Sequence, residues 1–505
     1  MRYGFLFGAG AEIAYNLPSG GRFALEIFRQ DTSSSKDFFK EMREKVDATT
    51  PYANQWLPKD YLNKNISTFG RAVFQNIIMS TVEHKRKQIV EKVNEFDDVA
   101  QEINKRLKAS GIDVDGAFFA LLNREVNNIQ LGQVIAYNEA LKTGNRLFES
   151  TYFSGLLTVY RDIMNDPNRV VLGKIILSIM QLQLGALSED LSRNINDNLF
   201  SKKDERIDLF DDFGDLIRLN YSAAGVSGLE YLLEEKESET STPYGIILRF
   251  AQLLIEEIYA SVLDYKALID SNWHYLYNPS SDWGKFCKIS IFLLSVREYM
   301  LKLGQEAVTE NSNGYYNTLK ASLDNVDFEA SIIATTNYNR IIEEVLGPEH
   351  PVTYLNGSVA VWYDPYLNKI GSAEDLDNSE HHIIIPLIFT QSGTKPMTSI
   401  SMSVKYVEMY NQWKQSDAVV VVGFGFGTDD EHINGILRTL VDDDKKDLIV
   451  VRLNHGKSEV DESKHIAKKL KIRSSSRIHT ILVNQDGTQN GKTWTSCLQM
   501  MIDKE

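Results

Sequence analysis

Residues 417–427 read DAVVVVGFGFG, an apolar run that ends in a turn with three glycines. A continuous apolar run without alternation is typical of a parallel strand that is covered on both faces. Two similar runs follow at residues 447–454 (DLIVVRLN) and 478–484 (IHTILVN), and a helix is predicted at 430–441 between the first two runs. Because strand and helix signals alternate, this part of the chain predicts a doubly wound α/β sheet.

The segments that precede this stretch continue the same pattern. Strands are predicted at residues 330–339 (ASIIATTNYN), 352–359 (VTYLNGSV) and 382–389 (HIIIPLIF), and a helix at 403–415. One further strand, RYGFLF at residues 2–7, stands alone near the N-terminus. Since it has no strand partner nearby in the sequence, we expect it to join the C-terminal sheet.

The long stretch between these parts is predicted to be helical. Prolines are few there, and apolar residues recur at helical spacing, as at Leu254 and Ile258. The predicted fold is therefore an α/β protein with a mainly parallel, doubly wound sheet that is interrupted by a large helical insertion. Residues 1–22 and 328–505 would form the sheet domain, and residues 23–327 an insertion with a regulatory or oligomerisation role.

Composition argues against several classes of partner. The 505 residues include 54 basic and 69 acidic side chains, a net charge of −15. Such a surface repels phosphate backbones and anionic lipids, so neither nucleic acid nor a membrane is an expected partner. Cys287 and Cys497 are the only cysteines, too few for a four-cysteine zinc site, and no metal is expected. Without a signal-peptide pattern or an apolar stretch of ~20 residues, a cytoplasmic location is expected.

A glycine-rich turn, Gly8-Ala9-Gly10-Ala11, follows the first predicted strand and precedes a predicted helix. Glycines in such a turn let the backbone approach a pyrophosphate, and a helix N-terminus supplies amide donors. The third glycine of the usual dinucleotide fingerprint is replaced by Ile13. Taken alone, the motif is explained equally well as a tight turn.

Three more segments follow later strands in the same way. Their candidate ligand-facing residues are Thr336, Asn337 and Asn339, then Gly423, Phe424 and Gly425, and finally Asn454. In an open α/β sheet, ligands bind outside the carboxyl ends of the strands. Each segment alone is also explained by a helix N-cap or a turn. Together, four such segments at strand ends predict a ligand-binding site.

The order GAGAEIAYNLPSG, TTNYN, YLNGS, VVVGFGFGTDDEHI and VVRLN resembles the Sir2-like (sirtuin-fold) family, which binds NAD⁺. It looks most like the bacterial Sir2-like proteins of antiphage defence, whose members hydrolyse NAD⁺ to nicotinamide and ADP-ribose. The resemblance covers roughly residues 1–22 and 328–485. It implies NAD⁺ as the substrate, and an activity controlled through homo-oligomers or through a partner protein of the same defence system.

The resemblance also implies a role for each matching residue. Gly8, Ala9, Gly10 and Ala11 would hold the pyrophosphate, and Pro18 and Ser19 would belong to the loop on the nicotinamide side. Asn337 would be the catalytic asparagine, with Thr336 beside it. Gly423, Phe424 and Gly425 would bracket the ribose and phosphates, and Asn454 would lie near the adenosine end.

Two positions depart from the family pattern. The usual aspartate two residues after the catalytic asparagine is Asn339 here, and the usual catalytic histidine is Asn356. An amide does not take up a proton at neutral pH, so Asn356 cannot act as a general base. Deacetylation is therefore not expected, whereas hydrolysis through an oxocarbenium-like state can rely on orientation and electrostatics. His432 is the first candidate for a replacement base, before the pair His381–His382.

A second hypothesis follows from the same two substitutions. The chain would then be a Sir2-like module that binds NAD⁺ or an ADP-ribose derivative and regulates a partner without catalysis.

Overall fold

The computed structural model describes residues 1–15, 17–18, 20–129, 146–194, 206–208, 218–220, 226–233, 238–263, 266–310, 314–377, 380–388, 398–454, 456–484 and 486–502. The chain forms two compact units. The first, the sheet unit, comprises Met1–Ser19, Gln30–Phe69 and Lys266–Glu505. The second, the helical unit, comprises Gly20–Arg29 and Gly70–Tyr265.

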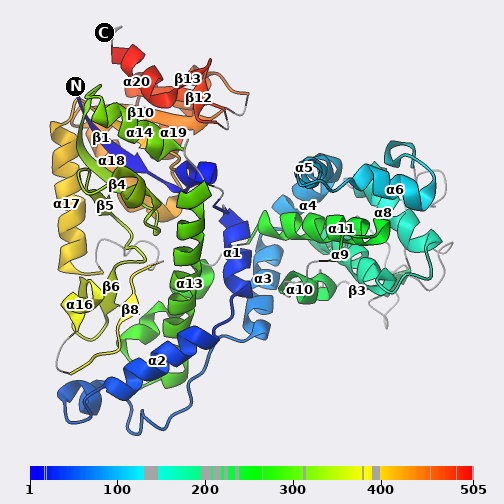
Figure 1. The fold of residues 1–505 in the computed structure, drawn as a ribbon, viewed down its shortest axis with the longest axis horizontal. Helices are drawn as coiled ribbons and strands as arrows, with labels where there is room; N and C mark the ends of the chain where they lie inside the picture. Colours follow the sequence, from blue (N-terminus) through cyan, green and yellow to red (C-terminus); the bar gives the residue numbers. More distant parts are fainter. Residues whose placement is uncertain are drawn as a thin grey trace. The chain divides into compact units, whose positions relative to one another are not determined.

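The sheet unit contains six parallel strands. They are β1 (Arg2–Phe7), β4 (Glu329–Thr335), β5 (Val352–Tyr354), β9 (Ala418–Val422), β10 (Asp447–Leu453) and β11 (Ile478–Val483). Their spatial order is β11-β10-β9-β1-β4-β5, and every neighbouring pair is parallel (Figure 1). This is the order of a doubly wound, Rossmann-like sheet. The prediction that the N-terminal strand joins the C-terminal sheet is confirmed, since β1 lies between β4 and β9.

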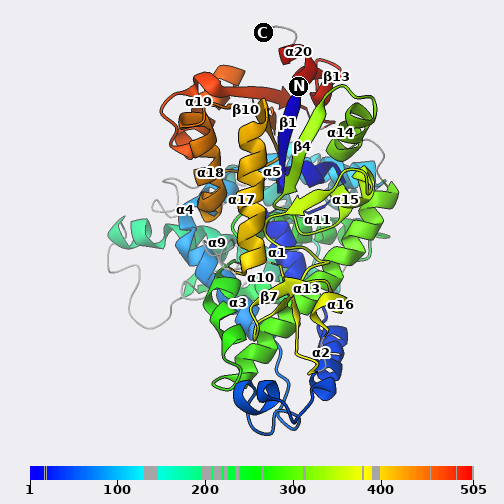
Figure 2. The ribbon, with the colours of Figure 1, turned by 90° about the vertical axis from the view of Figure 1, so that its left-hand side faces the viewer.

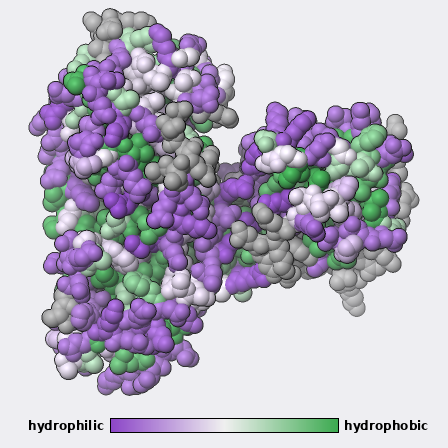
Figure 3. Space-filling view, viewed as in Figure 1, coloured by the Kyte–Doolittle hydropathy of each residue, from purple (hydrophilic) through white to green (hydrophobic). Residues whose placement is uncertain are grey.

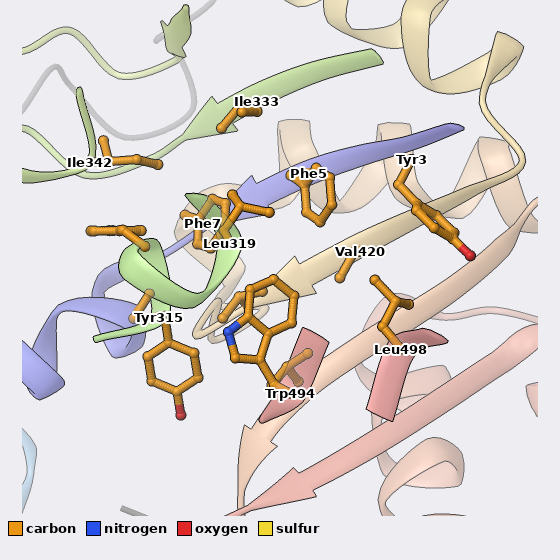
Figure 4. Packing of buried hydrophobic residues seen from close by; sticks show 14 of the residues in the cluster. Tyr3, Phe5, Phe7, Tyr315, Leu319, Ile333, Ile342, Val420, Trp494 and Leu498 are labelled. Atoms are coloured by element: carbon orange, nitrogen blue, oxygen red, sulfur yellow. The ribbon is translucent and has the colours of Figure 1, made fainter. Parts of the chain in front are cut away.

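Helices cover both faces of this sheet (Figure 2). On one face, Phe5 and Phe7 of β1 pack in an apolar core with α14 (Tyr315–Asp324), α15 (Ile341–Leu346) and α20 (Trp494–Ile502) (Figure 4). The other face carries α17 (Ile400–Gln415), α18 (Glu431–Asp442) and α19 (Glu459–Leu470). Gly4 of β1 is needed there, because a Cβ at this position would lie 2.1 Å from the Trp413 ring. With both faces covered, all five residues of β9 are buried, as its apolar sequence predicts.

The predicted strand at 382–389 does not belong to the main sheet. Only β8 (Ile385–Pro386) forms, and it pairs antiparallel with β6 (Trp362–Asp364), which also pairs with β7 (Lys369–Gly371). Pro386 has no amide hydrogen to donate to a second neighbour, so it suits a short edge strand rather than a central one.

The unit boundaries differ from those expected from composition. Residues 30–69 and 266–327, expected in the insertion, belong to the sheet unit. There α13 (Trp283–Glu310) contacts α2 (Ser33–Lys45) and α15. A helix that covers a sheet has the same apolar spacing as a helix in a bundle, so the sequence pattern does not separate the two.

The helical unit is organised around α11 (Pro243–Ala260), which contacts α1, α5, α6, α9 and α10. Thr242 caps this helix by accepting a hydrogen bond from the Gly245 amide, and Pro243 occupies its first turn. Phe250 is fully buried and packs against Phe118 and Tyr152. The predicted apolar face with Leu254 and Ile258 is buried here.

The remaining elements connect these parts. In the sheet unit they are η1 (Ala9–Tyr15), η2 (Tyr52–Trp56), α12 (Lys266–Asn272), η7 (Trp273–Tyr277), α16 (Ala373–Leu376), η9 (Thr428–Asp430), η10 (Ser475–Arg477), β12 (Thr488–Gln489) and β13 (Lys492–Thr493). In the helical unit they are α1 (Gly20–Arg29), α3 (Arg71–His84), α4 (Arg86–Asn94), α5 (Phe96–Ala109), α6 (Val114–Leu122), η3 (Val126–Asn128), η4 (Leu147–Glu149), α8 (Thr151–Asp162), α9 (Arg169–Asn194), β2 (Arg206–Asp208), β3 (Arg218–Asn220) and α10 (Val226–Leu233).

Hydrophilic residues cover much of the face drawn in Figure 3, in keeping with the net charge of −15. Among the residues that the structure describes, no helix has the length and apolar character needed to cross a membrane.

Candidate functional site

Two turns meet at the carboxyl edge of the sheet, where the strand order reverses between β1 and β9. The Gly8 amide donates to the Val422 carbonyl at 2.9 Å, and the Gly10 amide donates to the Gly423 carbonyl at 2.8 Å. In doubly wound sheets the ligand crevice lies at this switch point. Both predicted glycine turns therefore lie at the place where the fold provides a binding site.

Three of the glycines are explained by the contact between the turns. A Cβ at Gly10 would lie 2.8 Å from the Gly423 carbonyl oxygen, and one at Gly423 would lie 2.2 Å from the Ala11 nitrogen. Gly423 also has a φ of +66°, which favours glycine. Gly8 is equally close to Phe424. Gly8, Gly10 and Gly423 thus allow the backbones of the two turns to approach each other. Gly425 differs, because it is exposed and a Cβ there would have no atom within 4 Å, so there is room for a ligand beside it.

The element at the first turn is not an α-helix. Instead of an α-helix, the seven-residue 3₁₀ helix η1 follows β1. Pro18 disfavours helical geometry at Leu17, which limits its length. A helix N-terminus with a strong dipole is therefore not part of this turn.

The end of β4 places Asn337 beside the first turn. The Thr336 amide donates to the Phe7 carbonyl at 2.9 Å, which ties the two strand ends together. The Asn337 side-chain amide donates to the Gly8 carbonyl at 3.1 Å and to the Tyr316 hydroxyl at 3.2 Å. With both amide hydrogens used inward, the Oδ1 atom is the end of Asn337 that is left to accept a hydrogen bond from water or a ribose hydroxyl.

A buried carboxyl group, which the sequence analysis did not single out, lies behind Asn337. Glu12 Oε1 accepts a hydrogen bond from the Tyr316 hydroxyl at 3.1 Å, and Oε2 accepts one from the Asn339 side-chain amide at 2.5 Å. Burial raises the pKa of Glu12 to about 7, although hydrogen bonds from Asn339, Tyr316 and Asn337 work in the opposite direction. The only sequence signal was an acidic residue directly after an apolar glycine turn.

The positions Asn356 and His432 are joined through a tyrosine. The Asn356 amide donates to the Thr336 carbonyl at 3.4 Å, and its Oδ1 accepts from the Tyr406 hydroxyl at 3.2 Å. His432 Nε2 lies 3.1 Å from that same hydroxyl. Burial raises the pKa of Tyr406 well above its ordinary value, so the hydroxyl keeps its single proton. Because Tyr406 donates that proton to Asn356, Nε2 of His432 is the donor in the other bond.

The other predicted site residues lie along the same edge. Ala11 and Phe424 are buried, Pro18 is half-buried, and Ala9 and Asn454 are exposed. Asn454 follows β10 and accepts a hydrogen bond from the Gly456 amide, as in a turn. Ser19 lies outside the described residues. The structure thus joins Asn337, Asn339, Asn356 and His432 into two hydrogen-bonded groups. The Asn454 side chain bonds within its own turn, and its backbone amide donates to the Val483 carbonyl of β11 at 2.8 Å.

The pair His381–His382 forms no hydrogen bond with these groups. His382 is buried in the small sheet, with Nδ1 2.7 Å from Asp364 and Nε2 2.8 Å from Glu380. His381 is exposed and lies 3.1 Å from Asp377. Within the described ranges, no group of three or more His, Cys, Asp or Glu side chains is arranged to hold a metal ion.

No protein-family model matches the sequence, and no curated protein matches it either. The functional argument therefore depends on the geometry of this edge. That geometry brings together an exposed turn at Gly425, the Asn337 amide with its Oδ1 left to accept, and a buried carboxyl group on Glu12.

Proposed function

We propose that this protein hydrolyses NAD⁺ to nicotinamide and ADP-ribose at the carboxyl edge of the sheet. The observation that carries the proposal is the position of Asn337: its amide is held by Gly8 and Tyr316, and its Oδ1 is left to orient a water molecule or a ribose hydroxyl at the switch point. In the reaction, water adds to the ribose carbon, the bond to nicotinamide breaks with its electron pair going to the leaving nitrogen, and one proton is released.

The resemblance to Sir2-like defence proteins supports a biological role for this reaction. Depletion of NAD⁺ would then be the output of a bacterial antiphage system. Since unregulated depletion would kill the host, we propose that the helical unit serves control, through a partner protein or a second copy of the chain.

The test is NAD⁺ consumption by the purified chain, alone and with the products of neighbouring genes, followed by chromatography of nicotinamide and ADP-ribose. We expect Asn337→Ala to lower kcat by roughly 100-fold, because orientation of the attacking group is lost. Asn272→Ala is the matched control, since this half-buried asparagine of α12 bonds only within its own helix region. Equal rates for both variants would contradict the assignment of Asn337.

One observation favours a second candidate, a module that binds NAD⁺ or an ADP-ribose derivative and regulates a partner. Both ends of the Asn356 amide are engaged by Thr336 and Tyr406, and this position holds no group that accepts a proton. Tight NAD⁺ binding measured by calorimetry, without turnover in any condition, would support this candidate and contradict hydrolysis.

A further inference from the structure

Glu12 is held by groups from two other parts of the chain. Tyr316 from α14 and Asn339 from the segment after β4 each donate to one carboxyl oxygen. The titratable groups that interact with it are all tyrosines: Tyr316, Tyr354 of β5 and Tyr15 of its own element. Within the described residues, no Lys, Arg or His forms an ion pair with Glu12. Burial of an ionised carboxyl group without a neighbouring cation lowers the stability of the folded protein, so a structural role alone accounts poorly for Glu12.

The ionisation state of Glu12 determines the direction of the hydrogen bonds that lead to Asn337. An ionised carboxylate only accepts, so the Tyr316 hydroxyl donates its one proton to Glu12. The Tyr316 oxygen is then free to accept from the Asn337 amide, as observed at 3.2 Å. The Asn337 amide nitrogen is consequently fixed by Gly8 and Tyr316, which leaves Oδ1 to accept from a ligand.

We propose that ionised Glu12 is a positioning residue that acts through Tyr316 to orient the Asn337 amide for hydrolysis of NAD⁺, and this inference rests on the proposed function. A neutral carboxyl group carries a proton of its own and can donate it to Tyr316. The hydroxyl of Tyr316 would then donate toward Asn337, so the amide would either lose its bond to Tyr316 or turn over and lose its bond to the Gly8 carbonyl. Protonation of Glu12 would thereby disturb the orientation of the Asn337 amide.

The same contact places a carboxyl group beside position 339. Glu12 from the first turn supplies it, and the Asn339 side-chain nitrogen lies 2.5 Å from Oε2.

The consequence is a pH dependence that belongs to this network. Since burial raises the pKa of Glu12 to about 7, turnover should fall as the pH drops below 7, by about tenfold for each pH unit. Binding of NAD⁺ should change much less than kcat, because Glu12 lies behind Asn337 rather than in the crevice.

The experiment measures kcat and KM for NAD⁺ from pH 5.5 to 8.5 in the full-length protein and in Glu12→Gln, Tyr316→Phe and the double variant. We expect each single variant to lower kcat at pH 8 by roughly 10- to 100-fold with a small change in KM, and to lose the acidic limb of the profile. The double variant should be no slower than the worse single variant, because both substitutions break one chain of hydrogen bonds.

Tyr354→Phe is the control, since its ring is also buried beside this network, but among the described residues its hydroxyl forms no hydrogen bond with Glu12, Tyr316 or Asn337. It should keep the wild-type pH profile. If Glu12→Gln does not fold, Tyr316→Phe still tests the chain of hydrogen bonds from Glu12 to Asn337. Two results would overturn the role of Glu12: losses of kcat that multiply in the double variant, or an acidic limb of the pH profile that persists in Glu12→Gln. Neither result would contradict the proposed hydrolysis of NAD⁺. Absence of turnover by the wild type at every pH would overturn the proposed function and this inference with it.

Discussion

At the scale of single residues, Glu12 connects the stability of the protein to pH. Its pKa is raised from 4.5 to about 7 by burial, so the folded protein holds this proton more tightly than the unfolded chain. The contribution of this group to the unfolding free energy is therefore lost as the pH rises from about 4.5 to 7. Above pH 7 the unfolding free energy should be lower by roughly 3 kcal/mol than below pH 4.5, because the buried carboxylate is then ionised.

Substitution of Glu12 by glutamine should remove this dependence. The difference in unfolding free energy between Glu12→Gln and wild type should move in favour of the variant as the pH rises from 5 to 8. Denaturant titration at four pH values measures it. Parallel curves for the two proteins would show that the carboxyl group is not buried in the way described.

The glycines of the second turn differ in what a side chain would meet. At Gly423, a Cβ would clash with the Ala11 nitrogen, and φ is positive; at Gly425 it would meet nothing within 4 Å. Gly423→Ala should therefore destabilise the protein by at least ~1–2 kcal/mol. Gly425→Ala should fold normally and weaken NAD⁺ binding. Thermal unfolding and calorimetry give the two readings, and an equal loss of stability in both variants would contradict the close contact of the turns.

At the scale of elements, the small sheet β7-β6-β8 contains a pH-sensitive contact. Burial works to lower the pKa of His382, but the hydrogen bonds and charges of Asp364 and Glu380 raise it above its ordinary value. A raised histidine pKa contributes stability that is fully present below the unfolded value of ~6.5 and is lost as the pH rises through the folded value.

Removal of one partner should reveal that contribution. Glu380→Gln should lower Tm more at pH 5.5 than at pH 9, as measured by differential scanning fluorimetry. Asp377→Asn is the control, because its partner His381 is exposed and such pairs contribute little. A loss of Tm that does not vary with pH would mean that His382 is neutral throughout.

The elements also show which sequence patterns carry structural information. The apolar runs that form β1, β4, β9, β10 and β11 predicted their strands because burial on both faces demands such runs. The run at 382–389 is equally apolar but is buried in the small sheet, since periodicity reports burial and not the identity of the neighbour. In the candidate site, Asn337 was predictable from its position after a strand. Tyr316 and Tyr406 were not, because they lie within helices α14 and α17, and helical spacing does not show which residue of a helix reaches the site.

At the scale of the whole molecule, each compact unit has a core of its own, so each should unfold with a distinct transition. Phe250 is fully buried in the helical unit. Phe250→Ala should therefore lower the unfolding free energy of that unit by ~3–5 kcal/mol and reduce the midpoint temperature of one calorimetric transition. If NAD⁺ binds at the carboxyl edge of the sheet as proposed, it should raise only the other transition. A single transition that both changes shift equally would contradict this division.

Domain boundaries were the least predictable feature at this scale. Residues 30–69 and 266–327 are helical by pattern, yet they belong to the sheet unit. Their partners are decided by which apolar faces meet in three dimensions, which helical spacing alone does not encode.

The contact between Gly10 and Gly423 has a consequence for protein synthesis. The two residues are 413 positions apart (423 − 10), and β1 has both of its neighbours, β4 and β9, in the C-terminal half of the chain. At ~5–20 residues per second, the ribosome needs roughly 20–80 s between making the first turn and the second. A nascent or truncated chain that stops before residue 423 has no completed crevice. A cell that makes this protein therefore has the paired turns only on chains that have passed residue 423, however many ribosomes are translating the message.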